Sequence, residues 1–165
     1  MNTEQNNLSR LTLNNFAPPG FMKIIYPDTL IGCNLQDLAQ IQIDLDPEEI
    51  KGKVLLLFIW DMQQRHSRAI IKELASQTKN LEQKDLVIIC IQTSKVNEDE
   101  LKEWTKTNGI SFPVIISETN EQQTHLSWGA RSLPWLILTD KEHIVTSEGF
   151  GIDELDEKIT TLTEK

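Results

Sequence analysis

The sequence has few of the residues that most directly indicate a chemistry. Cysteine occurs only twice, as Cys33 and Cys90, and neither belongs to a Cys-x-x-Cys pair. Two cysteines cannot build a disulfide framework, although one bridge between them remains formally possible. The cysteines and histidines lack the spacing of a zinc site, and His125 and His143 have no ligand-spaced partners. The sequence therefore predicts neither a metal nor a cofactor.

Basic residues and long apolar runs are also scarce. Lys and Arg number 16 against 25 Asp and Glu, which gives a net charge of −9. Because phosphate groups would be repelled, nucleic acid and an anionic membrane surface are excluded as partners. No apolar run approaches the roughly 20 residues that span a bilayer, so direct membrane insertion is not predicted either. The sequence does not indicate the oligomeric state.

The beginning of the sequence, MNTEQNNLSR, lacks the basic region and the apolar core of a secretory signal. A complete chain would therefore be cytoplasmic, whereas a chain excised from a longer envelope protein would be extracytoplasmic. Residues 1–30 are polar, rich in Asn and interrupted at 17–20 (APPG), which is typical of a tail or linker. The pattern predicts one domain over residues 31–165.

From about residue 31 the hydrophobic periodicity alternates between strand and helix. Continuous apolar runs at 53–60 (KVLLLFIW) and 86–91 (LVIICI) predict strands buried on both faces. Further strands are predicted at 113–117, 135–139 and 144–147, the last two joined by a turn at 140–143. Helical spacing predicts helices at 70–81, 97–108, 119–128 and 152–162, the second of them capped by Asn97. This order predicts an α/β fold with a mixed β-sheet flanked by helices.

Three stretches in this order resemble the thioredoxin-like superfamily, in particular its TlpA-like, or redoxin, branch. Residues 51–60 resemble the family's first core strand, 67–74 the start of its active-site helix, and 129–140 the segment that carries its cis-proline. The resemblance covers roughly residues 31–163. It implies a thioredoxin-like fold, a cis Leu133–Pro134 bond and an ancestry among thiol–disulfide oxidoreductases.

The active-site motif of that family, Trp-Cys-x-x-Cys, is missing. Gln64 stands where the resemblance places the attacking cysteine, Ser67 where it places the resolving one, and Arg65 and His66 lie between them. An amide cannot form a thiolate and a hydroxyl cannot form a disulfide, so thiol–disulfide exchange is excluded at these positions. Cys90 lies in an apolar run and is expected to be inert, whereas Cys33 lies outside any Cys-x-x-Cys pair and is expected to be incidental.

Two hypotheses about function remain. The first is a redox-inactive interaction module that binds an extended peptide or protein near the cis-proline, in a groove formed by Leu133, Pro134, Trp135 and Trp60, with no catalytic residue. The alternative is a divergent oxidoreductase that uses Cys33 or a thiol supplied by a partner. Either could be one domain of a larger envelope protein, because TlpA-like domains are often tethered to membranes.

Three polar features nearby allow more than one interpretation. The basic and polar island of residues 65–68 is either a solvated helix start or a site for a carboxylate or phosphate. Adjacent helical side chains do not face each other, so His66 and Ser67 do not predict a hydrolase. Asp61 and Glu73 are expected to be a loop residue and a surface helix residue.

Overall fold

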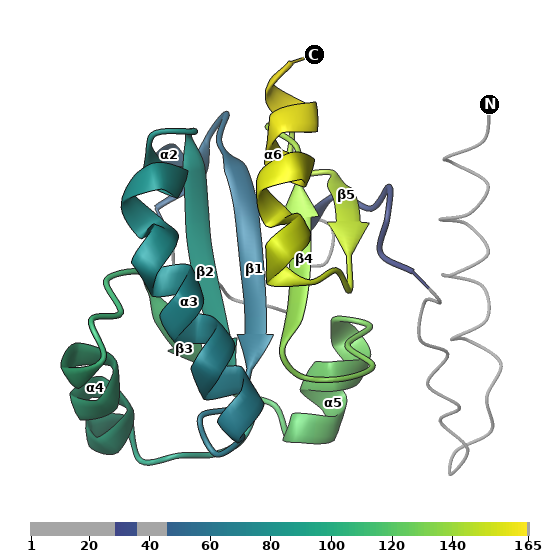
Figure 1. The fold of residues 1–165 in the computed structure, drawn as a ribbon. Coiled ribbons are helices and arrows are strands. Elements are labelled where there is room, and N and C mark those ends of the chain that lie inside the picture. The colour runs from purple at the N-terminus through teal and green to yellow at the C-terminus, as the bar shows by residue number, and fades with distance from the viewer. Residues whose placement is uncertain (1–28, 36–45, 165) are drawn as a thin grey trace, which may run out of the picture.

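The structure, a computed structural model, describes residues 29–35 and 46–164. The first half of these residues contains a short helix, two long strands and a long helix (Figure 1). In chain order these are α2 (Pro47–Ile50), β1 (Val54–Trp60), α3 (Arg65–Glu82) and β2 (Leu86–Gln92). The second half adds α4 (Glu98–Thr107), β3 (Val114–Ile116), α5 (Glu121–Ser127), β4 (Trp135–Thr139), β5 (Val145–Glu148), the 3₁₀ helix η2 (Ile152–Glu154) and α6 (Leu155–Thr163).

The strands form one mixed sheet in the order β3-β2-β1-β4-β5. The strands β1, β2 and β3 run parallel, whereas β4 is antiparallel to β1 and β5 is antiparallel to β4. Helices α3 and α6 cover one face of this sheet in Figure 1. The predicted α/β fold with a mixed sheet flanked by helices is thereby confirmed.

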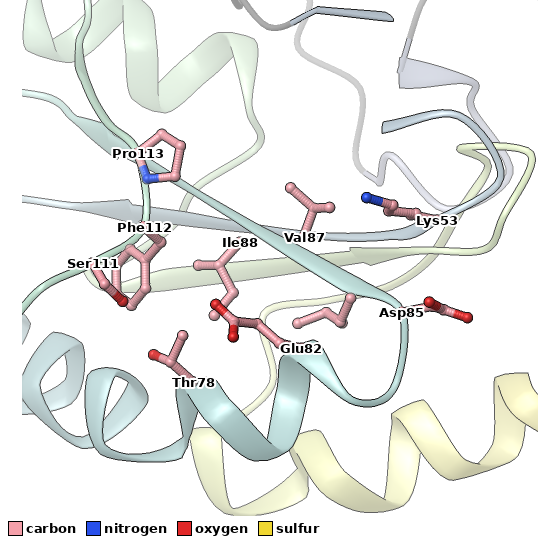
Figure 2. A pocket seen from close by; sticks show the side chains of 10 residues that line it. Lys53, Thr78, Glu82, Asp85, Val87, Ile88, Ser111, Phe112 and Pro113 are labelled. Atoms are coloured by element: carbon pink, nitrogen blue, oxygen red, sulfur yellow. The ribbon is translucent and has the colours of Figure 1, made fainter. Parts of the chain in front are cut away.

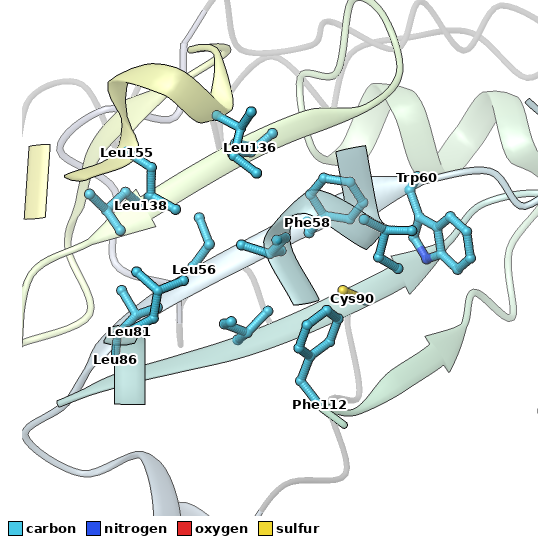
Figure 3. Packing of buried hydrophobic residues seen from close by; sticks show 14 of the residues in the cluster. Leu56, Phe58, Trp60, Leu81, Leu86, Cys90, Phe112, Leu136, Leu138 and Leu155 are labelled. Carbon is cyan, nitrogen blue, oxygen red and sulfur yellow. The ribbon is translucent and has the colours of Figure 1, made fainter. Parts of the chain in front are cut away.

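The central strand β1 is buried along its whole length because the sheet is covered on both faces. Leu56, Phe58 and Trp60 point into a core shared with α3, α4 and α6, which Figure 3 shows. Leu55, Leu57 and Ile59 point to the opposite face and pack in a second core with Leu30, Trp128, Ile137 and Val145. Burying each such side chain contributes roughly 1.5–3 kcal/mol, so β1 stabilises the cores on both faces of the sheet.

Side-chain caps explain where three of the helices in the described residues begin. Asn97 precedes α4 and accepts hydrogen bonds from the N–H groups of Asp99 and Glu100, as predicted for a helix cap. Strand β4 has the predicted range, the other strands differ from theirs by one residue at one or both ends, and α2 was not predicted. Leu30 is fully buried. The proposed boundary after residue 30 remains a prediction, because residues 1–28 lie outside the described part of the chain.

Candidate functional site

One end of the sheet gathers the elements that the sequence analysis singled out. Trp135, the first residue of β4, lies opposite Ile59, so the Leu133–Pro134 segment falls beside the end of β1. Gln92, the last residue of β2, lies opposite Trp60, and α3 begins five residues beyond β1. Ligands of open α/β sheets commonly bind outside the carboxyl ends of parallel strands. This end of the sheet is therefore the candidate site.

The positions of the missing cysteines lie at the start of α3. Gln64 is the N-cap residue, and its side chain makes no capping hydrogen bond. Gln64, Arg65 and His66 are exposed, whereas Ser67 is fully buried. The Ser67 Oγ has no hydrogen-bond partner among the described residues. The helix thus presents the Arg65 guanidinium, the His66 imidazole and no thiol at the place where the resemblance puts the redox centre.

The Leu133–Pro134 peptide bond is cis, as the resemblance implies. Among the described residues, the backbone N–H and C=O of Leu133 make no hydrogen bond, while its side chain packs on the second core. The neighbouring Trp135 is half-buried, and a Cβ atom at Gly149 would lie 2.4 Å from its ring. Gly149 also has a positive φ of 64°, so both the ring contact and the backbone conformation favour glycine there. The Trp135 ring therefore packs over Gly149.

The prediction that Trp60 lines a surface groove is wrong. Its side chain is fully buried and packs against Trp104, with ring centroids 5.5 Å apart. Because side chains alternate along a strand, Trp60 and Trp135 belong to cores on opposite faces of the sheet. The groove residues that remain at the surface are Leu133, Pro134 and Trp135.

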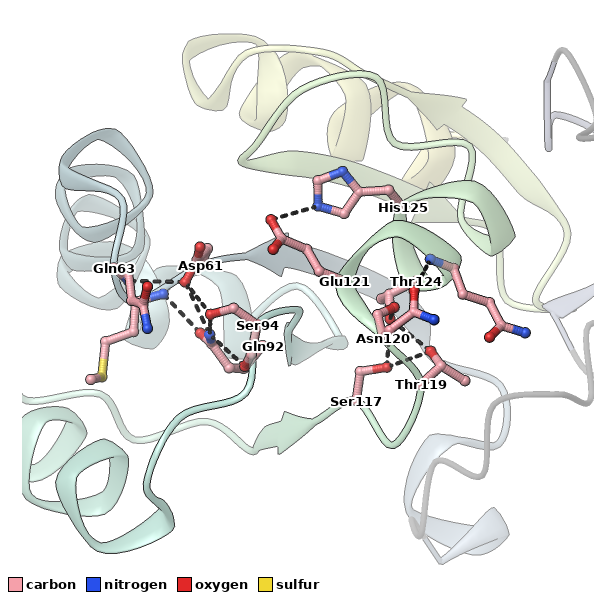
Figure 4. A network of polar contacts seen from close by, with 12 residues as sticks. Asp61, Gln63, Gln92, Ser94, Ser117, Thr119, Asn120, Glu121, Thr124 and His125 are labelled. Carbon is pink, nitrogen blue, oxygen red and sulfur yellow. Dashed lines mark hydrogen bonds and ion pairs between the residues drawn. The ribbon is translucent and has the colours of Figure 1, made fainter.

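A buried polar network links the ends of β1 and β2 (Figure 4). Asp61 is only 5% exposed, and its Oδ1 accepts hydrogen bonds from the Gln63 N–H, the Gln92 Nε2 and the Ser94 Oγ. The Gln92 Oε1 in turn accepts from the Met62 N–H at 2.8 Å. Asp61 lies in the β1–α3 loop, as expected, but it is buried there by these hydrogen bonds. The network fixes the β1–α3 loop and with it the start of α3.

This network has a weak sequence signal. Asp61 and Gln92 each stand at the end of a long apolar run, and the carboxyl ends of neighbouring parallel strands meet at one sheet edge. Two polar residues in those positions are placed to contact each other. Glu73, by contrast, is exposed on α3, as expected.

The two cysteines do not form a disulfide. Cys90 lies within the first core, and Cys33 lies in a half-buried position. Burial raises the pKa of the Cys90 thiol well above its ordinary value, because the thiolate would be desolvated. Cys90 is therefore unsuited to nucleophilic chemistry.

This burial predicts the outcome of a thiol titration. At pH 8, native protein is expected to react with 5,5′-dithiobis(2-nitrobenzoate) at no more than one thiol, and a second thiol should appear only in denaturant. The Cys33→Ser variant should show no reaction in the native state. Fast labelling of that variant would mean that Cys90 is accessible, contrary to the structure.

The histidines do not converge on a metal. The His143 Nε2 donates to the carbonyl oxygen of Ile50 at 2.9 Å, and the His125 Nε2 lies 3.8 Å from the Glu121 Oε1. Within residues 29–35 and 46–164, no group of three or more His, Cys, Asp or Glu side chains could hold a metal ion. In the same part of the chain no helix has the length and apolarity that crossing a membrane requires.

A separate pocket of about 290 Å³ lies at the opposite end of the sheet (Figure 2). It is lined by the first residues of β2, the last turn of α3 and the segment before β3. Lys53, Glu82 and Asp85 supply charges of both signs at its rim. The pocket lies at the amino ends of the parallel strands, whereas the first turn of α3 lies at their carboxyl ends. The pocket therefore does not belong to the candidate site.

Comparisons with known proteins agree with this geometry. The structure resembles a thiol-disulfide isomerase from Corynebacterium glutamicum, with a TM-score of 0.65, 17% identity, and coverage of 73% of this chain and 87% of that one. It also resembles a secreted thiol-disulfide isomerase of the same organism (TM-score 0.62, 15% identity, coverage 73% and 77%). A third similar structure is the thioredoxin-like superfamily protein SPOA0173 (TM-score 0.63, 21% identity, coverage 76% and 89%).

These similarities define the class of the molecule as a thioredoxin-like α/β protein. The sequence profile of the AhpC/TSA family matches residues 28–148. The chain therefore belongs to the AhpC/TSA family. No curated protein sequence matches the chain.

Proposed function

We propose that this chain is a TlpA-like member of the family that works without thiol chemistry, as a module that binds an extended polypeptide segment. The observation that carries this proposal is the free backbone of Leu133 beside the thiol-free start of α3. One N–H and one C=O at a sheet end can pair with an extended chain in the manner of strand addition. The pairing depends on main-chain groups, so it survives the loss of the cysteines.

The surroundings of Leu133 support the same proposal. Trp135 is half-buried against Gly149, so its ring offers apolar area at a fixed place. The buried Asp61 network orders the loop on the other side of the site. A binding surface with ordered walls loses less conformational entropy when it takes up a ligand.

The alternative of a relocated thiol centre is less well supported. Cys90 is buried in the core with a raised thiol pKa, and Cys33 lies next to β5 rather than at the start of α3. A reductase needs a second thiol to resolve the mixed disulfide. If purified protein reduced insulin in the presence of dithiothreitol, and Cys33→Ser abolished that activity, the alternative would be correct.

A backbone variant tests the binding proposal directly. Peptides selected from a displayed library on the full chain are expected to lose at least about tenfold in affinity on Leu133→Pro, because proline removes the N–H donor. Leu133→Val retains the donor and the apolar contact, and it should bind within about twofold. The far-ultraviolet circular dichroism of both variants reports whether the fold persists.

A second measurement keeps the proposal testable if Leu133→Pro does not fold. In the wild-type chain, bound peptide should slow hydrogen exchange of the Leu133 amide more than that of exposed amides in α4. Unchanged exchange at Leu133 with a saturating peptide would place the binding surface elsewhere and overturn the proposal.

A further inference from the structure

The amino half of β2 is an open sheet edge. Strand β2 pairs with β1 along its whole length, whereas β3 pairs only with the carboxyl half of β2, from Cys90 to Gln92. The Cys90 N–H donates to the Pro113 carbonyl oxygen at 2.9 Å, which is where the pairing with the β3 segment begins. Pro113 itself has no N–H and cannot continue the ladder. Among the described residues, Leu86 and Ile88 therefore have no neighbouring strand on that side.

The main-chain groups of Leu86 and Ile88 are unpaired at this edge. The residues that flank β2, Asp85 and Thr93, both bond to β1. Because bonded residues alternate along a strand, Leu86 and Ile88 direct their N–H and C=O groups away from β1. Neither residue has a main-chain hydrogen bond to any other described residue on that side, although each is only 4% exposed. Buried main-chain groups without a partner are costly, so they favour an external donor and acceptor.

The pocket of about 290 Å³ lies against this open edge (Figure 2). Leu86, Ile88 and Phe112 give it an apolar wall, and Glu82 and Ser111 add polar side chains. Its volume is near the lower end of the range of small-molecule sites, roughly 300–1,000 Å³. The pocket thus combines apolar area, unpaired main-chain groups and a carboxylate.

Glu82 carries the charge that the pocket leaves unbalanced. Lys53 and Asp85 directly precede β1 and β2, whose first residues are register partners, so these two charges are neighbours and offset each other. The Glu82 side chain makes no hydrogen bond or ion pair with another described residue. Glu82 is also the last residue of α3, where the helix dipole adds partial negative charge. The pocket therefore favours a cationic group in its ligand.

We propose that this pocket binds the free amino terminus of a short peptide. The terminal ammonium group contacts the Glu82 carboxylate, the amide that follows it pairs with the N–H and C=O groups of Ile88, and an apolar first side chain packs on Phe112. Two residues are too short an edge for a whole strand, but they suffice for one amide group. The site lies at the opposite end of the sheet from Leu133 and does not depend on the proposed function.

Titration of the full chain with matched dipeptides tests the proposal. L-leucyl-glycinamide has the ammonium group, the amide and an apolar side chain, whereas N-acetyl-L-leucyl-glycinamide lacks the charge. Each is added at constant ionic strength and about pH 6.5, where the α-amino group is protonated, and amide shifts are followed by ¹H–¹⁵N NMR. The free dipeptide should cause saturable shifts at residues 86–88 and 111–112 and bind at least about tenfold more tightly than the acetylated one, the size of a charged hydrogen bond.

Variants of α3 supply the matched comparison. Glu82→Gln removes the charge and keeps the shape of an exposed side chain, and it should weaken the free dipeptide at least about fivefold. Glu73→Gln changes an exposed acid of the same helix outside the pocket and should leave the affinity unchanged. Butylammonium chloride, which has the charge and an apolar body without an amide, should bind wild type at least about threefold more weakly than the dipeptide.

The outcomes separate this site from the surface at Leu133. Equal affinities for the free and acetylated dipeptides, or for wild type and Glu82→Gln, would overturn the proposal. Butylammonium binding as tightly as the dipeptide would overturn the role of the Ile88 main chain and with it the assignment to a peptide terminus. Saturable shifts at Leu133 with none at residues 86–88 would also overturn this site and leave the proposed function standing.

Discussion

Replacing Asp61 with alanine is expected to lower the free energy of unfolding by about 3 kcal/mol, because one buried donor and two partly buried donors lose their acceptor at once. The Gln92 side chain, itself fully buried, would lose its contact of 3.1 Å, and Ser94 would lose one of 2.7 Å. The Gln63 N–H would lose its acceptor as well. Urea denaturation followed by tryptophan fluorescence measures the change.

Two control variants make this result specific. Asp61→Asn keeps an oxygen at a similar position, so its loss of stability should be less than half that of Asp61→Ala. Glu103→Ala, an exposed acid on α4, should change the free energy of unfolding by no more than about 0.5 kcal/mol. Equal effects of the three substitutions would contradict the hydrogen-bond network as drawn in Figure 4.

The double variant Gln64→Cys/Ser67→Cys is expected to acquire a disulfide and measurable insulin reduction, neither of which the wild type should show. The two positions are the N-cap and third residue of α3, which are the positions that a capping box brings into contact. The helix terminus and the cationic Arg65 should lower the pKa of a thiol at position 64 below its ordinary value of about 8.5. The scaffold would then contain both thiols that exchange requires.

The measurement is a mass loss of about two hydrogens on mild oxidation, followed by the insulin assay with dithiothreitol. Gln64→Cys alone is the matched control, because it introduces the exposed thiol without a resolving partner and should remain near background. If the double variant stayed a dithiol in oxidising glutathione buffer, positions 64 and 67 would not correspond to the family's active-site pair.

The sequence predicted the long elements because their signals are local. The run at 53–60 is apolar enough to specify a strand buried on both faces, and the spacing from Ile70 to Leu81 specifies one buried helical face. Asn97 is a local signal as well, because its residue type alone favours a helix N-cap. The cis Leu133–Pro134 bond came from the resemblance, since an X-Pro pair alone does not specify its isomer.

The parts that escaped prediction depend on contacts distant in sequence. Asp61 and Gln92 are 31 residues apart, and only the parallel pairing of β1 and β2 brings them together. Trp60 was expected to line the groove at the cis-proline, but the alternation of β1 directs it into the core with Trp104. His143, 5% exposed, is buried by a contact to Ile50, which is 93 residues away.

The two edges of the sheet differ in how readily another molecule could extend them. Outside β5, Gly32 donates to the Val145 carbonyl oxygen and Val145 donates to that of Cys33, so this edge is already occupied. At the other edge lies β3, which has three residues and pairs only with β2 among the residues that the structure describes. Pro113, which lacks an N–H, stands directly before it. A second molecule could thus pair its own strand with only a very short edge strand. This disfavours aggregation by strand pairing at high protein concentration.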